Sequence, residues 1–510
     1  MPFEKSTKKV YKNTLFLYFR MLLLLGVNLY TSRIILEALG VIDFGIYNVV
    51  AGIIVVLSFV NNSMSLAVNR YISFEMGRDN GGAVGRIFSV SVNIHALIAL
   101  MVIVFGETVG LWFVNYKLVI PPERIVAANW IYQFSIFSFV MTVFRVPYNA
   151  MIIAYEEMKA YAYISIVEGL LRLLIAYSIL YITFDKLIVY GGLMALSVAL
   201  VTVVYIFFCL HKYVECRYRF IWDGNLIKSM GQYAGISTMG NLSSVVLDQG
   251  QNILLNMFFG PVLNAARGIA YQVNTALNVF VSNLYMAATP QITKSYAADD
   301  REYFVKIVNQ TALFSQLCLT VLVVPVIVEL PYLLHLWLGD GFPEATVIFG
   351  RLVLLNMFTA NLVKTLLIAL QSASKIFKVH FYTGMLTICN IPIDYVLLKW
   401  FHVEAYQVFI VQFIIDLIFI YVVLYLAKKQ LVWNISEYLF RVILPMFLLF
   451  ISDVLLLYII MEALPVNFLT VSLSFLISGF FILFLAYMFV FPKTMKMFLK
   501  DKLRNLIHRS

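Results

Sequence analysis

Long apolar segments, each separated from the next by a short polar break, are the feature that most constrains this chain. A helix needs about 20 mostly apolar residues to cross a bilayer, and the sequence holds fourteen such segments. The loops between them are too short to fold as separate soluble domains. The expected spans are 14–37, 43–70, 85–114, 124–153, 161–183, 187–210, 229–258, 262–291, 304–335, 345–371, 379–399, 404–427, 441–461 and 468–491.

The composition agrees with a membrane protein. Hydrophobic residues make up 62% of the 510 residues and charged residues 13%, whereas soluble domains are about half apolar and a quarter charged. We therefore expect an all-α integral membrane protein of about fourteen transmembrane helices. The cysteines show no metal-binding or paired spacing and are expected in the apolar core; they are Cys209, Cys216, Cys318 and Cys389.

Basic residues predict the orientation of the chain in the membrane. If the N-terminal lysines lie inside, the loops on that side hold 25 Lys and Arg and the opposite loops only 4. Because cytoplasmic loops carry an excess of Lys and Arg, both termini of this multi-pass protein are predicted to be cytoplasmic. The net charge of +10 is spread over many short loops, which argues against nucleic-acid binding.

The C-terminal sequence "TMKMFLKDKLRNLIHRS" places Met495, Leu499, Leu503 and Leu506 on one helical face. Lysines and arginines occupy the other face. This pattern is typical of a helix that lies on anionic lipids of the inner leaflet. A frayed basic tail is the alternative.

Two stretches 220 residues apart resemble each other. "LEALGVIDFGIYNVV" begins at Leu36 and "LNMFFGPVLNAARGIAYQV" at Leu255, with Gly40 and Gly260 at the same turn between two long helices. We therefore predict two six-helix lobes, 1–212 and 213–427, followed by two extra helices and the basic tail in 428–510. Six is an even number, so the lobes form a parallel repeat, as in transporters that rock two bundles about a central site.

The turns "LGVIDFGIYNVV" (39–50) and "FFGPVLNAARGIA" (258–270) make the chain resemble bacterial polysaccharide flippases of the Wzx type. Their superfamily also holds the MATE drug exporters and the lipid II flippases. The resemblance extends over most of residues 10–430. It implies a V-shaped, two-lobed exporter that flips undecaprenyl-pyrophosphate-linked oligosaccharides outward, with helices 1, 2, 7 and 8 around the cavity and an ion gradient as the driving force.

Polar residues recur on single faces of three predicted helices. Because such stripes cannot face lipid, they predict a water-filled cavity, and hydrogen bonding within a dry bundle is the alternative. The predicted cavity-lining residues are Asn62, Asn69, Asn241, Ser244 and Gln251. Asp248 is the only acid on its stripe and is the predicted ion-coupling residue. Arg267 begins the longest stripe and is predicted to bind substrate, or else to pair with Asp248.

Other polar residues complete the predicted substrate-binding set, which comprises Arg20, Arg33, Arg267, Tyr271, Asn274, Asn278 and Lys364. Arginine suits a pyrophosphate because its planar fork donates two hydrogen bonds at once. Each weaker candidate has a structural alternative. Arg33 could pair with Glu37 at the interface, and Lys364 could extend its side chain to the inner interface, as Arg145 could at the matching point of the first lobe. Glu168 and Arg172 are spaced for a local ion pair.

Three functions compete. Flipping of a lipid-linked oligosaccharide fits the basic character of the lining helices, with protons or sodium as coupling ions and a polymerase or chain-length protein as a partner. A cation-coupled multidrug exporter of the same fold would favour an acidic or aromatic cavity. A polysaccharide polymerase or glycosyltransferase would need a large outer loop with catalytic groups, and the outer loops here are short. No nucleotide-binding or hydrolase motif occurs, so no enzyme activity, cofactor or metal is expected.

Overall fold

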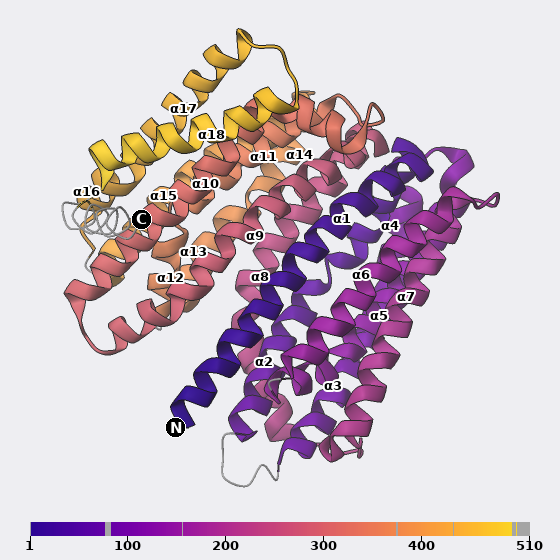
Figure 1. The fold of residues 1–510 in the computed structure, drawn as a ribbon. Helices are drawn as coiled ribbons and strands as arrows, with labels where there is room; N and C mark the ends of the chain where they lie inside the picture. Colours follow the sequence, from indigo (N-terminus) through magenta and orange to yellow (C-terminus); the bar gives the residue numbers. More distant parts are fainter. Residues whose placement is uncertain are drawn as a thin grey trace. The chain divides into compact units, whose positions relative to one another are not determined.

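In the computed structural model, the described part of the chain consists of helices and the loops that join them (Figure 1). The described residues are 2–76, 83–155, 157–373, 376–431, 433–491 and 496. Side-chain positions are described from residue 21 onward, apart from a few positions within helices. The basic C-terminal sequence that we predict to be amphipathic lies outside the described residues, except for Lys496.

The chain divides into two compact units that differ from simple sequence halves. The first comprises 1–268, 337–346 and 387–405, and the second comprises 269–336, 347–386 and 406–510. The predicted lobes 1–212 and 213–427 follow the sequence repeat rather than this packing, and they stay a prediction.

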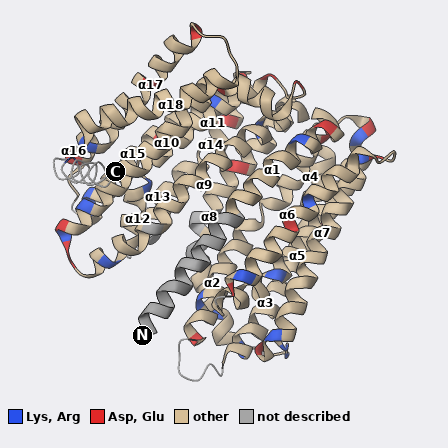
Figure 2. Cartoon of the chain, in the orientation of Figure 1, with Lys and Arg blue, Asp and Glu red and all other residues tan. Residues whose placement is uncertain are grey.

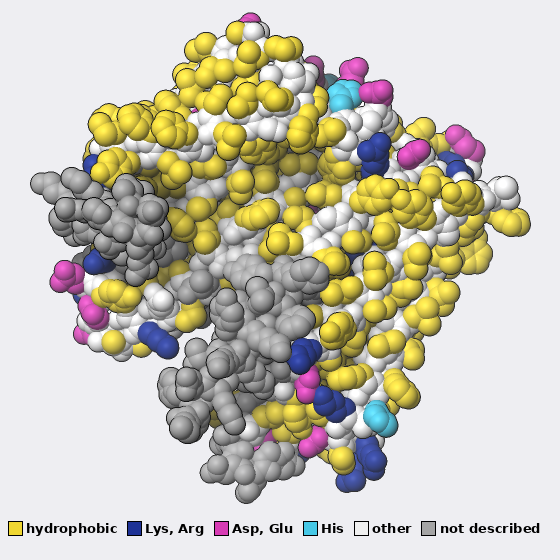
Figure 3. All heavy atoms as spheres, viewed as in Figure 1, with side chains coloured by type: hydrophobic (Ala, Val, Ile, Leu, Met, Phe, Trp, Pro, Cys, Tyr) yellow, Lys and Arg dark blue, Asp and Glu magenta, His cyan; other side chains and the backbone are white. Residues whose placement is uncertain are grey.

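Most of the first unit is a bundle of helices. They are α1 (Pro2–Val55), α2 (Ser58–Met76), α3 (Val84–Phe105), α4 (Leu111–Tyr116), α5 (Ile125–Ala154), α6 (Met158–Leu180), α7 (Lys186–Lys212), α8 (Gly224–Phe259), the first two turns of α9 (Pro261–Ala297), and α14 (Asn390–Trp400). Large apolar side chains such as Phe137, Leu174 and Phe207 are exposed on α5, α6 and α7, and apolar side chains cover much of this face (Figure 3). Such a surface fits contact with lipid acyl chains.

The second unit contains the rest of α9 and the later helices. They are α10 (Arg301–Leu338), α11 (Ala345–Asn361), α12 (Lys364–Ser372), α13 (Ile376–Ile388), α15 (Gln407–Leu431), α16 (Ile435–Tyr438), α17 (Leu444–Glu462) and α18 (Phe468–Leu485). Two π-helical segments, η4 (Leu439–Ile443) and η5 (Ala486–Val490), lie at the start of α17 and the end of α18.

Eleven described helical segments are long and apolar enough to cross a membrane. The long helices α8 and α9, of 36 and 37 residues, and the 19-residue α2 are more polar. Together they agree with an all-α membrane fold of about fourteen spans. Lys, Arg, Asp and Glu are sparse along the described helices (Figure 2).

The glycines of the sequence repeat have the same unusual backbone geometry. Gly40 has φ 75° and ψ 169°, and Gly260 has φ 80° and ψ −176°. Only glycine adopts this region without strain. At Gly40 the chain bends within α1, and at Gly260 it ends α8 and starts α9. The predicted equivalence of the two turns is confirmed at the level of the backbone.

Two predicted spans are each kinked into two helices but remain single candidate membrane spans, Ala345–Ser372 and Lys378–Trp400. The span predicted at 345–371 breaks between α11 and α12, and the span predicted at 379–399 breaks at Cys389, between α13 and α14. The second break has a local cause. Pro392 has no backbone N–H, so the carbonyl of Ile388 loses its helical partner.

Candidate functional site

A cluster of buried asparagines surrounds the turn between α8 and α9. Asn264 donates its side-chain amide to the Asn252 side-chain oxygen at 2.8 Å, and Asn256 donates to Asn264 at 3.0 Å. The backbone N–H of Val119 donates to Asn256 at 2.8 Å. All three asparagines are at most 5% exposed. Buried polar groups that satisfy one another in this way specify one arrangement of the chain, and the sequence analysis did not identify them.

Helix α1 approaches this turn so closely that one of its positions, Gly45, excludes a side chain. A Cβ atom on Gly45 would lie 1.9 Å from the backbone oxygen of Pro261, and one on Gly52 would lie 2.4 Å from a side-chain oxygen of Gln249. The Asn252 amide also donates to the backbone oxygen of Asn48 at 3.3 Å. The second half of α1 therefore packs directly against the backbone of α8 and α9.

Arg267 and Asp248 form an ion pair between α9 and α8. A guanidinium nitrogen of Arg267 lies 2.7 Å from the Asp248 carboxylate and 2.7 Å from its backbone oxygen. The Arg267 side chain is only 5% exposed, whereas that of Asp248 is 42% exposed. Of the two alternatives for Arg267, the structure contains the pair. The accessible group of this pair is the carboxylate.

A second acid of the site, Asp394, is deeply buried. Gln251 donates to one Asp394 carboxylate oxygen at 3.3 Å. The other oxygen is buried without a hydrogen-bond partner, as is the side-chain oxygen of Asn390, four residues earlier on α14. Asp394, Asn390 and Gln251 are each at most 1% exposed. Because a buried carboxylate is costly unless it binds a proton or a cation, this arrangement is suited to either one.

Asp394 follows a kink at Cys389, where the helical hydrogen-bond pattern is interrupted for one residue while the backbone stays helical, with φ −59° and ψ −20°. The described residues contain no cluster of three or more His, Cys, Asp or Glu side chains able to hold a metal ion, so the oxygens near Asp394 fit a proton or a monovalent cation better than a transition metal.

The structure separates the predicted polar stripes into different environments. Along α8, Ser244 is exposed, Asp248 is partly exposed and Gln251 is buried. On α2, Asn62 is exposed, while Asn69 donates to the backbone oxygen of Ser65 at 2.9 Å. Gln251 is buried and donates to Asp394 at 3.3 Å, and the lining role of these residues stays a prediction.

The remaining predicted residues are spread over several helices. Arg33 is exposed on α1 and, among the described contacts, makes no ion pair with Glu37. The side chains of Arg20 and Asn241 lie outside the described set. In the second unit, the α9 residues Tyr271 and Asn274 are partly exposed and Asn278 is exposed, and Lys364 is exposed at the start of α12.

Further ion pairs fix other helices of the first unit. Glu168 binds Arg172 at 2.6 Å, which confirms the predicted local pair, and it also contacts Arg145 at 3.4 Å. Arg145 thus has an ion-pair partner within the bundle. Arg124 of the same unit binds two carboxylates, Asp43 and Asp185, each at 2.6 Å. Asp43 belongs to the first repeated stretch.

Comparisons with known proteins place this fold in a class. No protein-family profile matches the chain, and no curated protein matches it. Among solved structures, the lipid II flippase MurJ in an inward closed conformation has a TM-score of 0.70 at 13% identity, covering 94% of this chain and 98% of MurJ. An inward-facing multidrug resistance MATE transporter of the MOP superfamily has a TM-score of 0.64 at 13% identity, covering 81% of this chain and 94% of the transporter.

A third structure, a MOP superfamily transporter from Pyrococcus furiosus, has a TM-score of 0.55 at 16% identity, covering 84% of this chain and 96% of that transporter. The chain therefore shares the fold of these solved structures. These named structures are transporters and flippases, not enzymes.

Proposed function

We propose that this protein is a flippase that moves undecaprenyl-pyrophosphate-linked oligosaccharide repeat units across the bacterial inner membrane by alternating access. One observation carries the proposal. The likeness to the lipid II flippase covers 94% of the chain, whereas the likeness to the inward-facing MATE transporter covers 81%. The extra length of this chain that the flippase covers is about the length of two additional spans, such as α17 and α18. The Wzx-type resemblance of the two glycine turns supports an oligosaccharide as the cargo.

Ion coupling is part of the proposal, and it has two candidate residues. Asp248 exposes its carboxylate while it holds Arg267. Asp394 is fully buried beside the unpartnered oxygen of Asn390. Because uptake of a proton or sodium ion neutralises a buried carboxylate, Asp394 joins Asp248 as a proposed coupling residue.

Substrate contact is assigned to the basic and polar groups identified from the sequence. In this proposal Arg267 binds an anionic group of the lipid-linked substrate only after it leaves Asp248, so substrate and Asp248 compete for one guanidinium. The other proposed contacts are Arg20, Arg33, Tyr271, Asn274, Asn278 and Lys364, with Asn62, Asn69, Asn241, Ser244 and Gln251 lining the route.

The proposed setting follows from the charge distribution. Both termini are cytoplasmic, and the basic C-terminal sequence lies on anionic lipids of the inner leaflet. A polymerase or chain-length protein acts on the exported unit. The two lobes of the repeat rock about the route, and protons or sodium drive the cycle.

A multidrug exporter is the second candidate, because several MATE transporters share the fold and the accessible Asp248 carboxylate would suit a cationic drug. Proteoliposomes distinguish the two functions. A flippase transfers a lipid-linked oligosaccharide between leaflets and leaves the distribution of a cationic dye unchanged. A drug exporter accumulates the dye and leaves the glycolipid where it was.

A further inference from the structure

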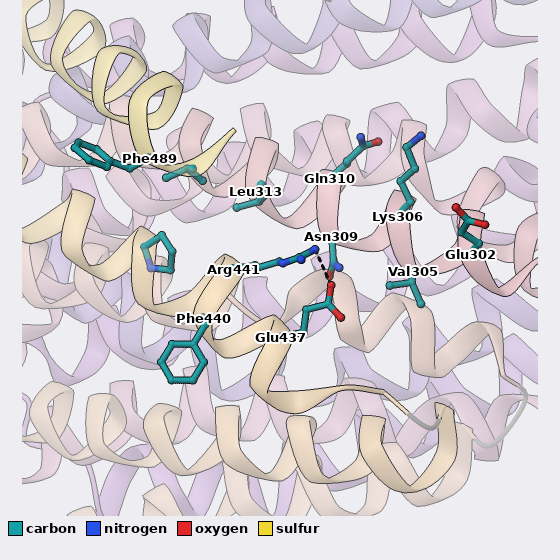
Figure 4. A pocket seen from close by; sticks show the side chains of 12 residues that line it. Glu302, Val305, Lys306, Asn309, Gln310, Leu313, Glu437, Phe440, Arg441 and Phe489 are labelled. Atoms are coloured by element: carbon teal, nitrogen blue, oxygen red, sulfur yellow. Dashed lines mark ion pairs between the residues drawn. The ribbon is translucent and has the colours of Figure 1, made fainter. Parts of the chain in front are cut away.

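A cavity of about 600 Å³ lies within the second unit, apart from the residues discussed above. One wall is the first part of α10, and the other walls come from the α16–α17 region and from the end of η5 (Figure 4). A volume of this size is within the range of small-molecule sites. Its lining residues are Glu302, Val305, Lys306, Asn309, Gln310, Leu313, Glu437, Phe440, Arg441, Pro445, Phe489 and Val490.

The three walls belong to chain segments that the predicted topology puts on one side of the membrane. The start of α10, the connection before α17 and the end of the last span all lie on the cytoplasmic side in that topology. The two π-helical segments η4 and η5 each supply wall residues. Single π-helical turns are rare and occur frequently at functional sites. The cavity is therefore expected at the level of the inner-leaflet headgroups.

The four charged side chains of the cavity fall into two groups, one that forms an ion pair and one that does not. Arg441 and Glu437 neutralise each other in an ion pair of 2.8 Å, which Figure 4 shows as a dashed line. Lys306 and Glu302 lie on α10 with exposed side chains, and no described ion pair involves either one. The side-chain oxygen of Asn309 is buried without a hydrogen-bond partner. The cavity thus offers one available cation and one available anion.

Apolar groups form the remainder of the lining. Leu313, Pro445 and the aromatic rings of Phe440 and Phe489 border the cavity, and the two rings are 63% and 79% exposed. An occupant that combines a headgroup carrying both charges with apolar chains would satisfy both halves of this surface. A purely anionic lipid would bring its charge next to Glu302 and leave that carboxylate without a partner.

We infer that this cavity binds an inner-leaflet phospholipid with a zwitterionic headgroup, of the phosphatidylethanolamine class. Lys306 binds the phosphate, Glu302 accepts hydrogen bonds from the ammonium group, and the acyl chains lie along Leu313, Phe440 and Phe489. The inference concerns a membrane lipid and does not depend on what the protein transports.

The test is native mass spectrometry of the purified full-length chain, delipidated and then mixed with phosphatidylethanolamine or phosphatidylglycerol. The unaltered chain should retain phosphatidylethanolamine preferentially. Lys306→Gln should weaken retention of both lipids by about tenfold, the lower end for one charge-assisted hydrogen bond. Glu302→Gln should reverse the preference toward phosphatidylglycerol, because it removes the ammonium partner and the repulsion of anionic lipid. Lys429→Gln, an exposed lysine on α15 outside the cavity, should behave like the unaltered chain.

Four results would overturn the inference. Retention that is unchanged in both Lys306→Gln and Glu302→Gln would show that no lipid binds here. Retention of phosphatidylglycerol over phosphatidylethanolamine by the unaltered chain would contradict the zwitterionic headgroup. Displacement of phosphatidylethanolamine by a stoichiometric amount of undecaprenyl pyrophosphate would assign the cavity to the polyprenyl lipid. A variant that ends at Phe491 and gains phosphatidylethanolamine binding absent from the full chain would assign it to residues 492–510.

Discussion

Arg267 holds Asp248 by two hydrogen bonds of 2.7 Å, one to the carboxylate and one to the backbone oxygen of the same residue. The two partners are unequal, because the arginine is buried and the aspartate is accessible. A group that binds the Asp248 carboxylate, or that offers Arg267 another anion, would therefore change the contact between α8 and α9.

The unequal burial predicts unequal costs of mutation. Asp248→Asn removes the carboxylate charge that pairs with the buried Arg267 guanidinium and should destabilise the protein by up to about 3–5 kcal/mol. Arg267→Gln leaves a carboxylate that water can reach, so it should cost only about 1–3 kcal/mol. The double variant should be more stable than Asp248→Asn alone. Thermal unfolding of the purified proteins in detergent measures the order of stability of the three variants.

Glu123→Gln, at an exposed position before α5, is the matched control and should unfold like the unaltered chain. Strictly additive losses in the double variant would contradict a direct pair, since residues in contact show non-additive effects.

Glycines on α1 give a second prediction. Gly45→Ala would place a methyl group 1.9 Å from the backbone oxygen of Pro261, whereas Gly26→Ala meets no atom within 4 Å. We expect Gly45→Ala to force α1 away from α9 and to reduce folded protein in the membrane strongly. Gly26→Ala should be neutral or stabilise the helix by about 0.5–1 kcal/mol. Size-exclusion profiles of the two variants, expressed side by side, report the difference, and equal profiles would refute the close approach.

The helices of this protein were largely predictable from sequence, because each span repeats the same local requirement for about 20 apolar residues. The turns at Gly40 and Gly260 were predictable for a different reason, since both repeats keep a residue that tolerates positive φ. The helix break at Cys389 was missed because apolar residues continue across it, and Pro392 alone marks it.

The candidate site was predictable only in part. The Arg267–Asp248 pair could be proposed because both residues lie on polar faces of consecutive helices. Asp394 could not be assigned, because its partner Gln251 is 143 residues away along the chain. Only the folded structure brings such distant residues together. A carboxylate close to a proline in an apolar span was the available signal, and it was not used.

Arg124 yields a prediction on pH. Burial acts to raise the pKa of Asp185, but the hydrogen bond from Arg124 and the backbone N–H groups of Ile188 and Leu187 outweigh it, so the net pKa is lowered. A lowered pKa stabilises the folded protein above the usual aspartate value of about 3.9, and this stability is lost as the pH falls through the folded-state pKa. Asp185→Asn should therefore lower the free energy of unfolding at neutral pH. It should also make the loss of stability on acidification smaller than in the unaltered chain.

Arg124→Gln should be more harmful than Asp185→Asn, since it leaves both Asp43 and Asp185 unpaired. The expected loss is about 1.5–3 kcal/mol or more, the range for hydrogen bonds to charged groups. Unfolding temperatures recorded between pH 3 and pH 7 test both statements. A steeper acid decline in Asp185→Asn than in the unaltered chain would contradict the assigned sign.

The buried oxygens near Asp394 predict an effect of ions on stability. If sodium binds there, replacing choline chloride by sodium chloride should raise the unfolding temperature, because a ligand that binds only the folded state stabilises it by about 2.7 kcal/mol at one hundred times its dissociation constant. Asp394→Asn and Asn390→Ala should abolish the sodium effect, and Asp416→Asn on α15 should keep it.

If the coupling ion is a proton, sodium should have no effect, and Asp394→Asn should instead abolish the response of transport to a pH gradient. A sodium or proton response that persists in Asp394→Asn but disappears in Asp248→Asn would move ion coupling to Asp248.

The most direct test of the central claim follows a lipid-linked oligosaccharide across the bilayer. Proteoliposomes are loaded with the undecaprenyl-pyrophosphate-linked glycan of the host, and a membrane-impermeant glycan-cleaving enzyme outside reports the accessible fraction over time. With an ion gradient present, we predict that the accessible fraction changes only in vesicles that contain the protein and not in empty vesicles. Equal accessibility with and without the protein, together with accumulation of a cationic dye, would contradict the flippase and support the drug exporter.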